Sequence, residues 1–167
     1  AGNEGNNRRH YYSDITSAPY QDEFELQVSG NDSMFSMEIW PNSPATLTIE
    51  IISPLGETTQ IIYPRINSCT PFTFARSQTI IWVNNYLLEQ ESGSQCILIR
   101  LSNPDEGVWN FRVQNINDEN FSFHSWLPSG ELISNDTYFI QSSPDTTITV
   151  PGNAEHVLTV TAYNQSN

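Results

Sequence analysis

The sequence predicts an all-β fold, an antiparallel β-sandwich, from three observations. Apolar and polar residues alternate along many short segments, as they do in strands that bury one face. Clusters of Gly, Pro, Asn, Asp and Ser separate these segments. No segment keeps the apolar period of about 3.6 residues that an amphipathic helix requires. The chain of 167 residues is also long enough to bury a sizeable core without a metal or a disulfide.

The alternating segments predict about eight strands in two sheets between residues 22 and 149. In chain order, the residues expected to point inward are Phe24, Leu26, Val28, Phe35, Met37, Ile39, Leu47, Ile49, Ile51, Ile97, Ile99, Leu101, Trp109, Phe111 and Val113. The turns between them are expected at residues 29–32, 41–44, 53–56, 91–94, 103–107 and 128–130. The last apolar run, at residues 157–162, is nearly continuous, which is typical of a strand buried on both faces.

The charge balance excludes some classes of partner. The net charge is −13, and the chain has six arginines and no lysine. Without a basic face, we expect no binding to nucleic acid and none to a membrane surface. No stretch is long and apolar enough to span a bilayer. The two cysteines, Cys69 and Cys96, permit one disulfide at most, and since both lie beside apolar residues we expect two buried thiols.

The two ends of the chain carry motifs of one enzyme family. The chain opens with Ala1-Gly2-Asn3-Glu4-Gly5, and it closes with Val150-Pro151-Gly152 followed by Val157-Leu158-Thr159-Val160-Thr161-Ala162. These runs resemble consecutive segments of the subtilisin-like serine proteases, namely the turn that carries the oxyanion-hole asparagine and the core strand after it. In most members the two segments are close in sequence, whereas here residues 6–149 intervene. Thr161 stands where many members have glycine.

The intervening part is similar to the jelly-roll insert of clostridial-type subtilases, including spore-germination proteases. The run Gly107-Val108-Trp109 resembles a strand of such inserts, and Trp126-Leu127-Pro128 supports the likeness. The resemblance implies that residues 1–21 are the oxyanion-turn segment and a lead-in, that residues 22–149 are a jelly-roll insert domain, and that residues 150–167 return to the protease core. It further implies a bacterial protein that is secreted or associated with the cell envelope or spore.

The resemblance implies one catalytic side chain, Asn3, which would donate a hydrogen bond to the oxyanion in the parent enzyme. The Asp, His and Ser of the triad would lie outside this chain, so we expect the chain by itself to lack peptidase activity. The three histidines, His10, His124 and His156, have no triad-like partners and are expected at the surface or at an interface. For the insert we expect a bracing role on the catalytic domain of the same polypeptide, or restricted access to its cleft.

Exposed aromatic residues leave a second class of function open. Trp40 and Trp126 are out of phase with the apolar residues of their strands, so one or both are expected to face outward. They would either contact the protease body or bind carbohydrate or another protein. Acidic residues at 22–25, 105–106 and 118–119 leave calcium open as a cofactor, although no EF-hand loop is present. The apolar run at 157–162 lacks its sheet neighbour and is expected to pair with another copy, giving a homo-oligomer.

Overall fold

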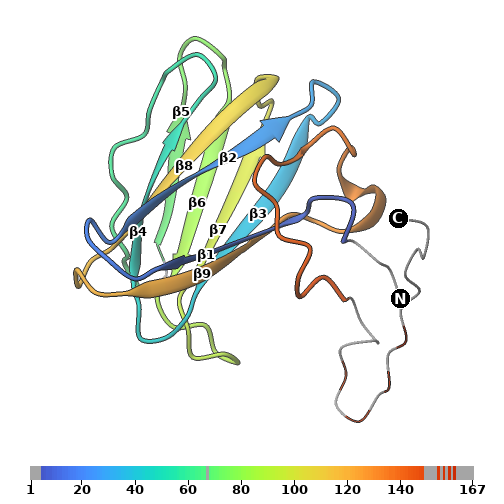
Figure 1. Cartoon of the computed structure of the whole chain (residues 1–167). Coiled ribbons are helices and arrows are strands. Elements are labelled where there is room, and N and C mark those ends of the chain that lie inside the picture. The colour runs from blue at the N-terminus through green and yellow to red at the C-terminus, as the bar shows by residue number, and fades with distance from the viewer. Residues whose placement is uncertain are drawn as a thin grey trace.

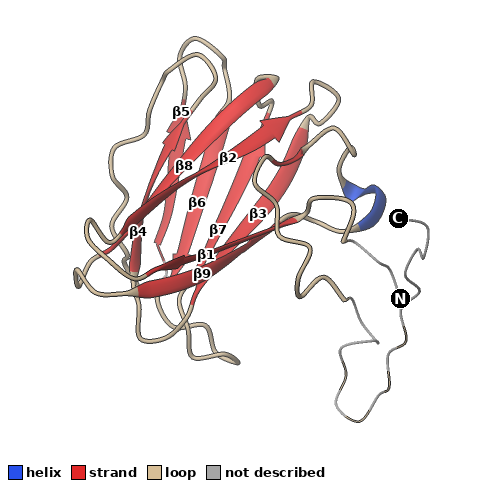
Figure 2. Cartoon of the chain, in the orientation of Figure 1, coloured by secondary structure: helices blue, strands red, loops and turns tan. Residues whose placement is uncertain are grey.

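The structure is a computed structural model that describes residues 5–66 and 68–148, with the single residues Ala154, His156, Leu158 and Val160. The described residues form two antiparallel sheets packed face to face, which confirms the predicted all-β sandwich (Figures 1 and 2). The only helix in these ranges is a single 3-10 turn, η1 (Gly130–Leu132). None of the described chain is therefore a helix of membrane-spanning length.

The described residues form ten strands. They are β1 (His10–Ile15), β2 (Gln21–Val28), β3 (Met34–Pro41), β4 (Leu47–Ile52), β5 (Ser68–Thr73), β6 (Ile80–Tyr86), β7 (Cys96–Ser102), β8 (Gly107–Asn115), β9 (Phe121–Trp126) and β10 (Tyr138–Phe139). Of these, β2 to β10 correspond to the range where about eight were predicted. β1 begins well before residue 22, in the segment expected to be a lead-in. Its inward side carries Tyr11, Ser13 and Ile15, so its sequence shows no simple apolar alternation.

The chain crosses repeatedly from one sheet to the other. The larger sheet has the order β1-β9-β3-β7-β6-β5, and the smaller has the order β10-β2-β8-β4. Residues 58–62 run along the outer side of β4, where Ile62 bridges Ile49 and Thr58 bridges Ile52. Strands β1, β9, β3 and β7 thus face β2, β8, β4 and this segment, which is the strand order of a jelly roll. The hairpin of β5 and β6 extends the larger sheet.

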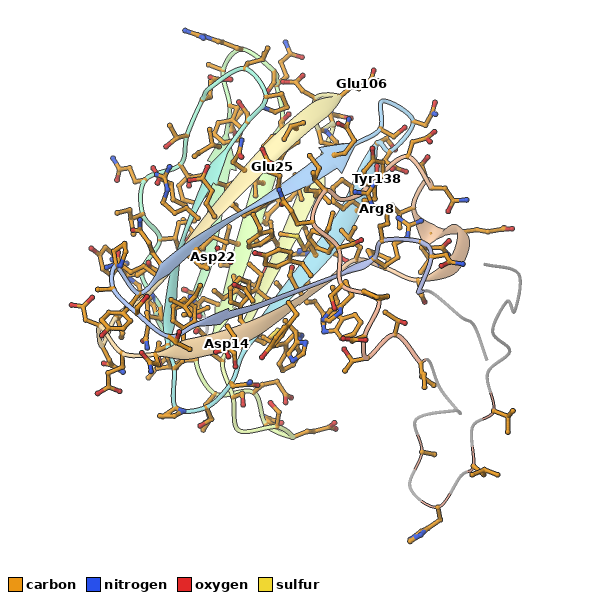
Figure 3. All side chains as sticks on the ribbon, viewed as in Figure 1. Arg8, Asp14, Asp22, Glu25, Glu106 and Tyr138 are labelled. Carbon is orange, nitrogen blue, oxygen red and sulfur yellow. The ribbon has the colours of Figure 1, made fainter. Side chains whose placement is uncertain are left out.

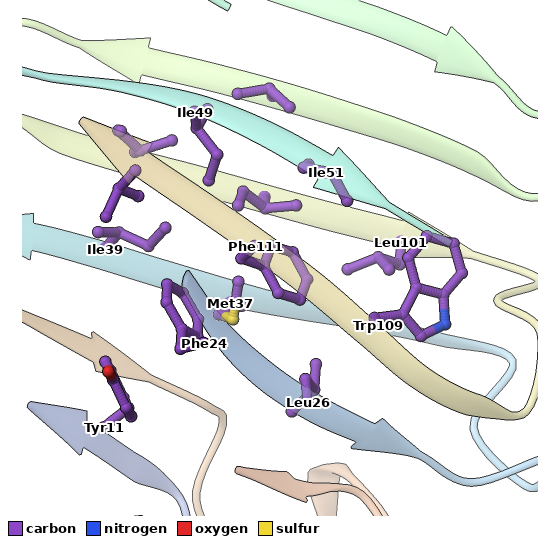
Figure 4. Packing of buried hydrophobic residues seen from close by; sticks show 14 of the residues in the cluster. Tyr11, Phe24, Leu26, Met37, Ile39, Ile49, Ile51, Leu101, Trp109 and Phe111 are labelled. Atoms are coloured by element: carbon purple, nitrogen blue, oxygen red, sulfur yellow. The ribbon is translucent and has the colours of Figure 1, made fainter. Parts of the chain in front are cut away.

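Inward-facing residues of both sheets form one core (Figure 4). Every residue that the alternation predicted to point inward is buried. The rings of Phe24 and Phe111 stack across β2 and β8 with centroids 5.4 Å apart. Full burial of each large apolar side chain contributes about 1.5–3 kcal/mol, so the interior supplies the main stabilisation of the sandwich.

The turn before β8 sets the position of the largest buried side chain, Trp109. Gly107 has φ 130°, and a Cβ at this position would lie 3.2 Å from Cβ of Pro54. Two residues later Trp109 is completely buried, and its indole N–H donates a hydrogen bond of 2.9 Å to the carbonyl of Asp105. The glycine therefore permits the tight approach that brings the indole into the core.

The incoming and outgoing ends of the sandwich lie side by side. The N–H of Phe139 donates to the carbonyl of Arg8 at 3.0 Å, and the N–H of Ser143 donates to the carbonyl of His10 at 2.8 Å. The guanidinium of Arg8 stacks on the ring of Tyr138, with 4.0 Å from Cζ to the ring centroid (Figure 3). The first strand of the sandwich and the segment that leaves it are thus paired along one edge.

The two cysteines differ in their exposure to solvent. Cys96 is buried as predicted, but the prediction for Cys69 is wrong, because its side chain points outward from the edge strand β5. Asn3 lies outside the described residues, as does most of the run at 157–162. Of that run only Leu158 and Val160 are described, with 90% and 83% of their surfaces exposed.

Candidate functional site

The outer face of the larger sheet gathers aromatic and histidine side chains from strands far apart in sequence. In the pairing of β9 with β1, Trp126 lies opposite His10, and His124 lies opposite Tyr12. In the pairing of β9 with β3, Trp126 lies opposite Glu38 and His124 opposite Trp40. Directly opposed residues of antiparallel strands share a face and touch. We refer to His10, Tyr12, His124 and Trp126 as the histidine cluster.

Ring stacking and one nitrogen–nitrogen hydrogen bond hold the histidine cluster together. The ring of His10 stacks on Trp126 with centroids 3.9 Å apart and an angle of 20° between planes. Nε2 of His10 lies 2.8 Å from Nδ1 of His124. Nδ1 of His10 lies 3.3 Å from the carbonyl oxygen of Ser143, which can only accept, so this nitrogen carries the proton. Nε2 of neutral His10 consequently accepts a hydrogen bond from Nδ1–H of His124.

This environment disfavours the charged form of both imidazoles. Burial lowers the pKa of His10 below its ordinary value of 6.5, and repulsion from His124 lowers it further, while Asp145 acts in the opposite direction. Burial also lowers the pKa of His124. Both rings therefore remain neutral at pH 7, and two protonated rings would lose the bond between them.

The histidine cluster contains no activated nucleophile. Within the described part of the chain, neither imidazole is hydrogen-bonded to a hydroxyl, a thiol or a carboxylate, so no pair of nucleophile and base is formed. Of the two alternatives for His10, surface or interface, the surface one is wrong, since the ring stacks on Trp126 and only 1% of the residue is exposed. His124 is half-buried and His156 is exposed. The contact of His10 with His124 depends on strand register, which no local motif signals.

A second feature of the same face is a groove beside Trp40. Both predicted tryptophans, Trp40 and Trp126, are half-buried on this outer face, but only Trp40 lines the groove. The indole N–H of Trp40 donates to a carboxylate oxygen of Glu38 at 2.9 Å. The open hollow measures about 1180 Å³ and lies between β3, β7 and the loop that joins β6 to β7. We call it the Trp40 groove. Of the residues that line it, the sequence predicted only Trp40 as a binding residue.

Two of the acidic residues considered for calcium have other partners. Asp22 accepts a hydrogen bond of 2.7 Å from the hydroxyl of Tyr11, and Glu23 forms an ion pair of 2.9 Å with Arg112. Across the described ranges, no group of three or more His, Cys, Asp or Glu side chains is placed to hold a metal ion. The sequence predicts no cofactor and leaves calcium open as an alternative.

Comparison with known proteins gives a likeness of fold. No family model and no curated protein matches the chain. Among solved structures, the chain is similar to that of the Clostridium perfringens CspB protease, with a TM-score of 0.83 and 24% sequence identity. The match covers 98% of this chain and 34% of that one, so this chain spans about a third of the protease. The chain therefore has the fold of one part of a larger protease.

Proposed function

We propose that the chain is a non-catalytic jelly-roll insert of a subtilisin-like serine endopeptidase. In this proposal it braces the catalytic domain of the same polypeptide or restricts access to its cleft. The parent would hydrolyse peptide bonds through a Ser/His/Asp triad outside this chain, and Asn3 would donate to the oxyanion. The fold likeness to one part of the CspB protease supports an association with a protease.

The observation that carries the proposal is the pairing of the incoming and outgoing segments. Because Arg8 and His10 are hydrogen-bonded through their carbonyls to Phe139 and Ser143, the two connections leave the sandwich together. A domain whose ends are adjacent can be inserted into a loop of a host without separating the host elements on either side. The same arrangement would hold the sandwich against its host through two neighbouring connections.

A buried arginine makes this edge rigid, as a brace requires. Arg9 is only 2% exposed. It donates to the carbonyls of Ile133, Ser134 and Thr137 at 3.1, 3.0 and 2.6 Å, and to the side-chain oxygen of Asn135 at 3.2 Å. Charge-assisted bonds of this kind tie the loop after η1 to the incoming segment.

The test uses the full-length parent polypeptide with residues 9–143 replaced by a short Gly/Ser loop. Turnover of a small peptide, turnover of a folded protein substrate and the half-life at elevated temperature are compared with the intact enzyme. A shorter half-life supports the brace, and faster cleavage of the folded substrate supports restricted access. Loss of cleavage of particular large targets with unchanged half-life and unchanged peptide turnover contradicts both and indicates a recognition module.

The alternative is a carbohydrate- or protein-binding module attached to the protease. The observation in its favour is the position of Trp40 and Trp126 on one solvent-facing sheet surface. Binding of the isolated chain to an oligosaccharide array, abolished by Trp40→Ala or Trp126→Ala, would establish this alternative.

We also propose that the isolated chain self-associates through residues 157–162, where the described residues Leu158 and Val160 are exposed. A strictly monomeric mass by light scattering at high concentration would contradict self-association.

A further inference from the structure

The Trp40 groove combines apolar surface from four parts of the chain. Trp40 and Leu98 contribute from the outer face of β3 and β7, and Leu88 projects from the loop between β6 and β7. Ile66, from the loop between β4 and β5, also lines the groove. Leu88 and Ile66 are 73% and 79% exposed, so two large aliphatic side chains that face solvent border one hollow.

Carboxylates surround this apolar surface. Glu38, Glu89 and Glu91 line the groove, and its described lining includes no arginine or histidine. Backbone N–H groups of Ser92 and Glu91 donate to the Glu89 carboxylate at 2.8 and 3.0 Å and lower its pKa, so that it is ionised at pH 7. Cys96 also lines the groove. Burial raises the pKa of its thiol, and the negative charges of Glu38 and Glu89 raise this pKa further.

We infer that the Trp40 groove binds an arginine-bearing apolar peptide segment of a separate protein. The guanidinium of such a segment is complementary to Glu38 and stacks on the neighbouring indole of Trp40. Aliphatic side chains on either side of the arginine would cover Leu98 and Leu88. This inference concerns the isolated chain and holds whether or not the chain is a protease insert.

Charge complementarity selects this occupant over a second copy of the chain. The chain has a net charge of −13 and six arginines. Arg9 is buried, and the side chains of Arg8, Arg76, Arg100 and Arg112 are all hydrogen-bonded within the chain. The sixth, Arg65, is exposed, so a second copy could present one arginine against its net charge of −13. A second acidic copy would be repelled from a groove with three carboxylates, whereas a basic segment would be attracted to it.

The experiment measures binding of a short peptide of alternating leucine and arginine to the full chain. Calorimetry gives the affinity, and the indole N–H signal of Trp40, assigned with Trp40→Phe, reports the location by NMR. A matched peptide with neutral citrulline in place of arginine has nearly the same shape without the charge. We expect the arginine peptide to shift the Trp40 signal and to bind at least about ten-fold more tightly than the citrulline peptide, an effect that weakens with added salt.

The matched variants separate the groove from the overall charge. Glu38→Gln combined with Glu89→Gln keeps an acceptor for the Trp40 indole and should weaken binding by about ten-fold, or about three-fold for each surface charge pair. Glu131→Gln combined with Asp136→Asn removes the same number of carboxylates at exposed positions outside the groove and should leave the affinity unchanged. Equal binding of the two peptides, no detectable binding, or an unaffected Trp40 signal would each overturn the inference. So would equal losses in the groove and control variants.

Discussion

Nδ1 of His124 donates a hydrogen bond of 2.8 Å to Nε2 of His10, and this bond joins side chains 114 residues apart in the chain. It ties the first strand of the sandwich to β9 on the outer face of the larger sheet. Because Nδ1 of the same His10 contacts the carbonyl of Ser143, the bond also links β9 to the outgoing segment. The ring of His10 therefore joins β1, β9 and the outgoing segment, and protonation of this ring affects both contacts.

The first prediction is a loss of stability as the pH falls. The pKa values of His10 and His124 are lower in the folded protein than the ordinary value of 6.5. The unfolded chain therefore binds protons first, and the free energy of unfolding should decrease as the pH falls below about 6.5, toward the folded pKa values. Urea unfolding between about pH 7 and pH 5.5 measures this slope before most carboxylates titrate.

Replacement of His124 provides the matched comparison. His124→Gln should make the stability less dependent on pH across this window, whereas His156→Gln, at an exposed position, should leave the slope unchanged. A slope that is the same in all three proteins would show that the histidine cluster does not control the pH dependence.

The second prediction concerns the buried guanidinium of Arg9. Arg9→Met keeps much of the side-chain volume but leaves the carbonyls of Ser134 and Thr137 without this donor. We expect the free energy of unfolding to fall by about 3 kcal/mol. Arg65→Met, at an exposed position, serves as the control and should change stability by less than about 0.5 kcal/mol. Comparable stability of the two variants would rule out Arg9 as the main fixing point of this edge.

The third prediction concerns Gln95, whose side-chain amide connects the two sheets. Its oxygen accepts from the N–H of Leu47 at 2.7 Å, and its nitrogen donates to the carbonyl of Leu47 at 3.0 Å. Gln95→Leu would leave both buried backbone groups unpaired and should cost about 2–3 kcal/mol. Thermal unfolding measures the effect, and Gln90→Leu in the exposed loop is the control. An unchanged melting temperature for Gln95→Leu would contradict the bridging role.

The fourth prediction separates the two thiols. Cys69 is exposed, whereas Cys96 is buried and burial raises its pKa to about 12. A maleimide at neutral pH should therefore label Cys69 in the folded protein and Cys96 only after unfolding in urea. Mass spectrometry of peptides from both conditions identifies the labelled residue. Rapid labelling of Cys96 in the folded Cys69→Ser variant would contradict the burial of its thiol.

The sequence by itself determined the fold class and most of the core. Period-two alternation placed Phe24, Met37, Ile49 and Phe111 on inward faces, because in a strand successive side chains point to opposite sides whatever the partner strand is. The Gly107–Trp109 pattern was also readable from the sequence, because the glycine in the tight turn and the buried indole lie only two residues apart. Local chemistry could not reveal β1, where tyrosine and serine face inward.

Tertiary structure alone decided the candidate sites. The contacts of His10 with His124 and Trp126 require the register of β1 on β9, and a shift by one residue would turn these side chains to the opposite face. The Trp40 groove likewise needs the loop between β6 and β7 to stand beside β3. Alternation specifies which way each side chain points along its own strand. Which strands become neighbours depends on long-range packing of the two sheets, and that determines which outward side chains meet.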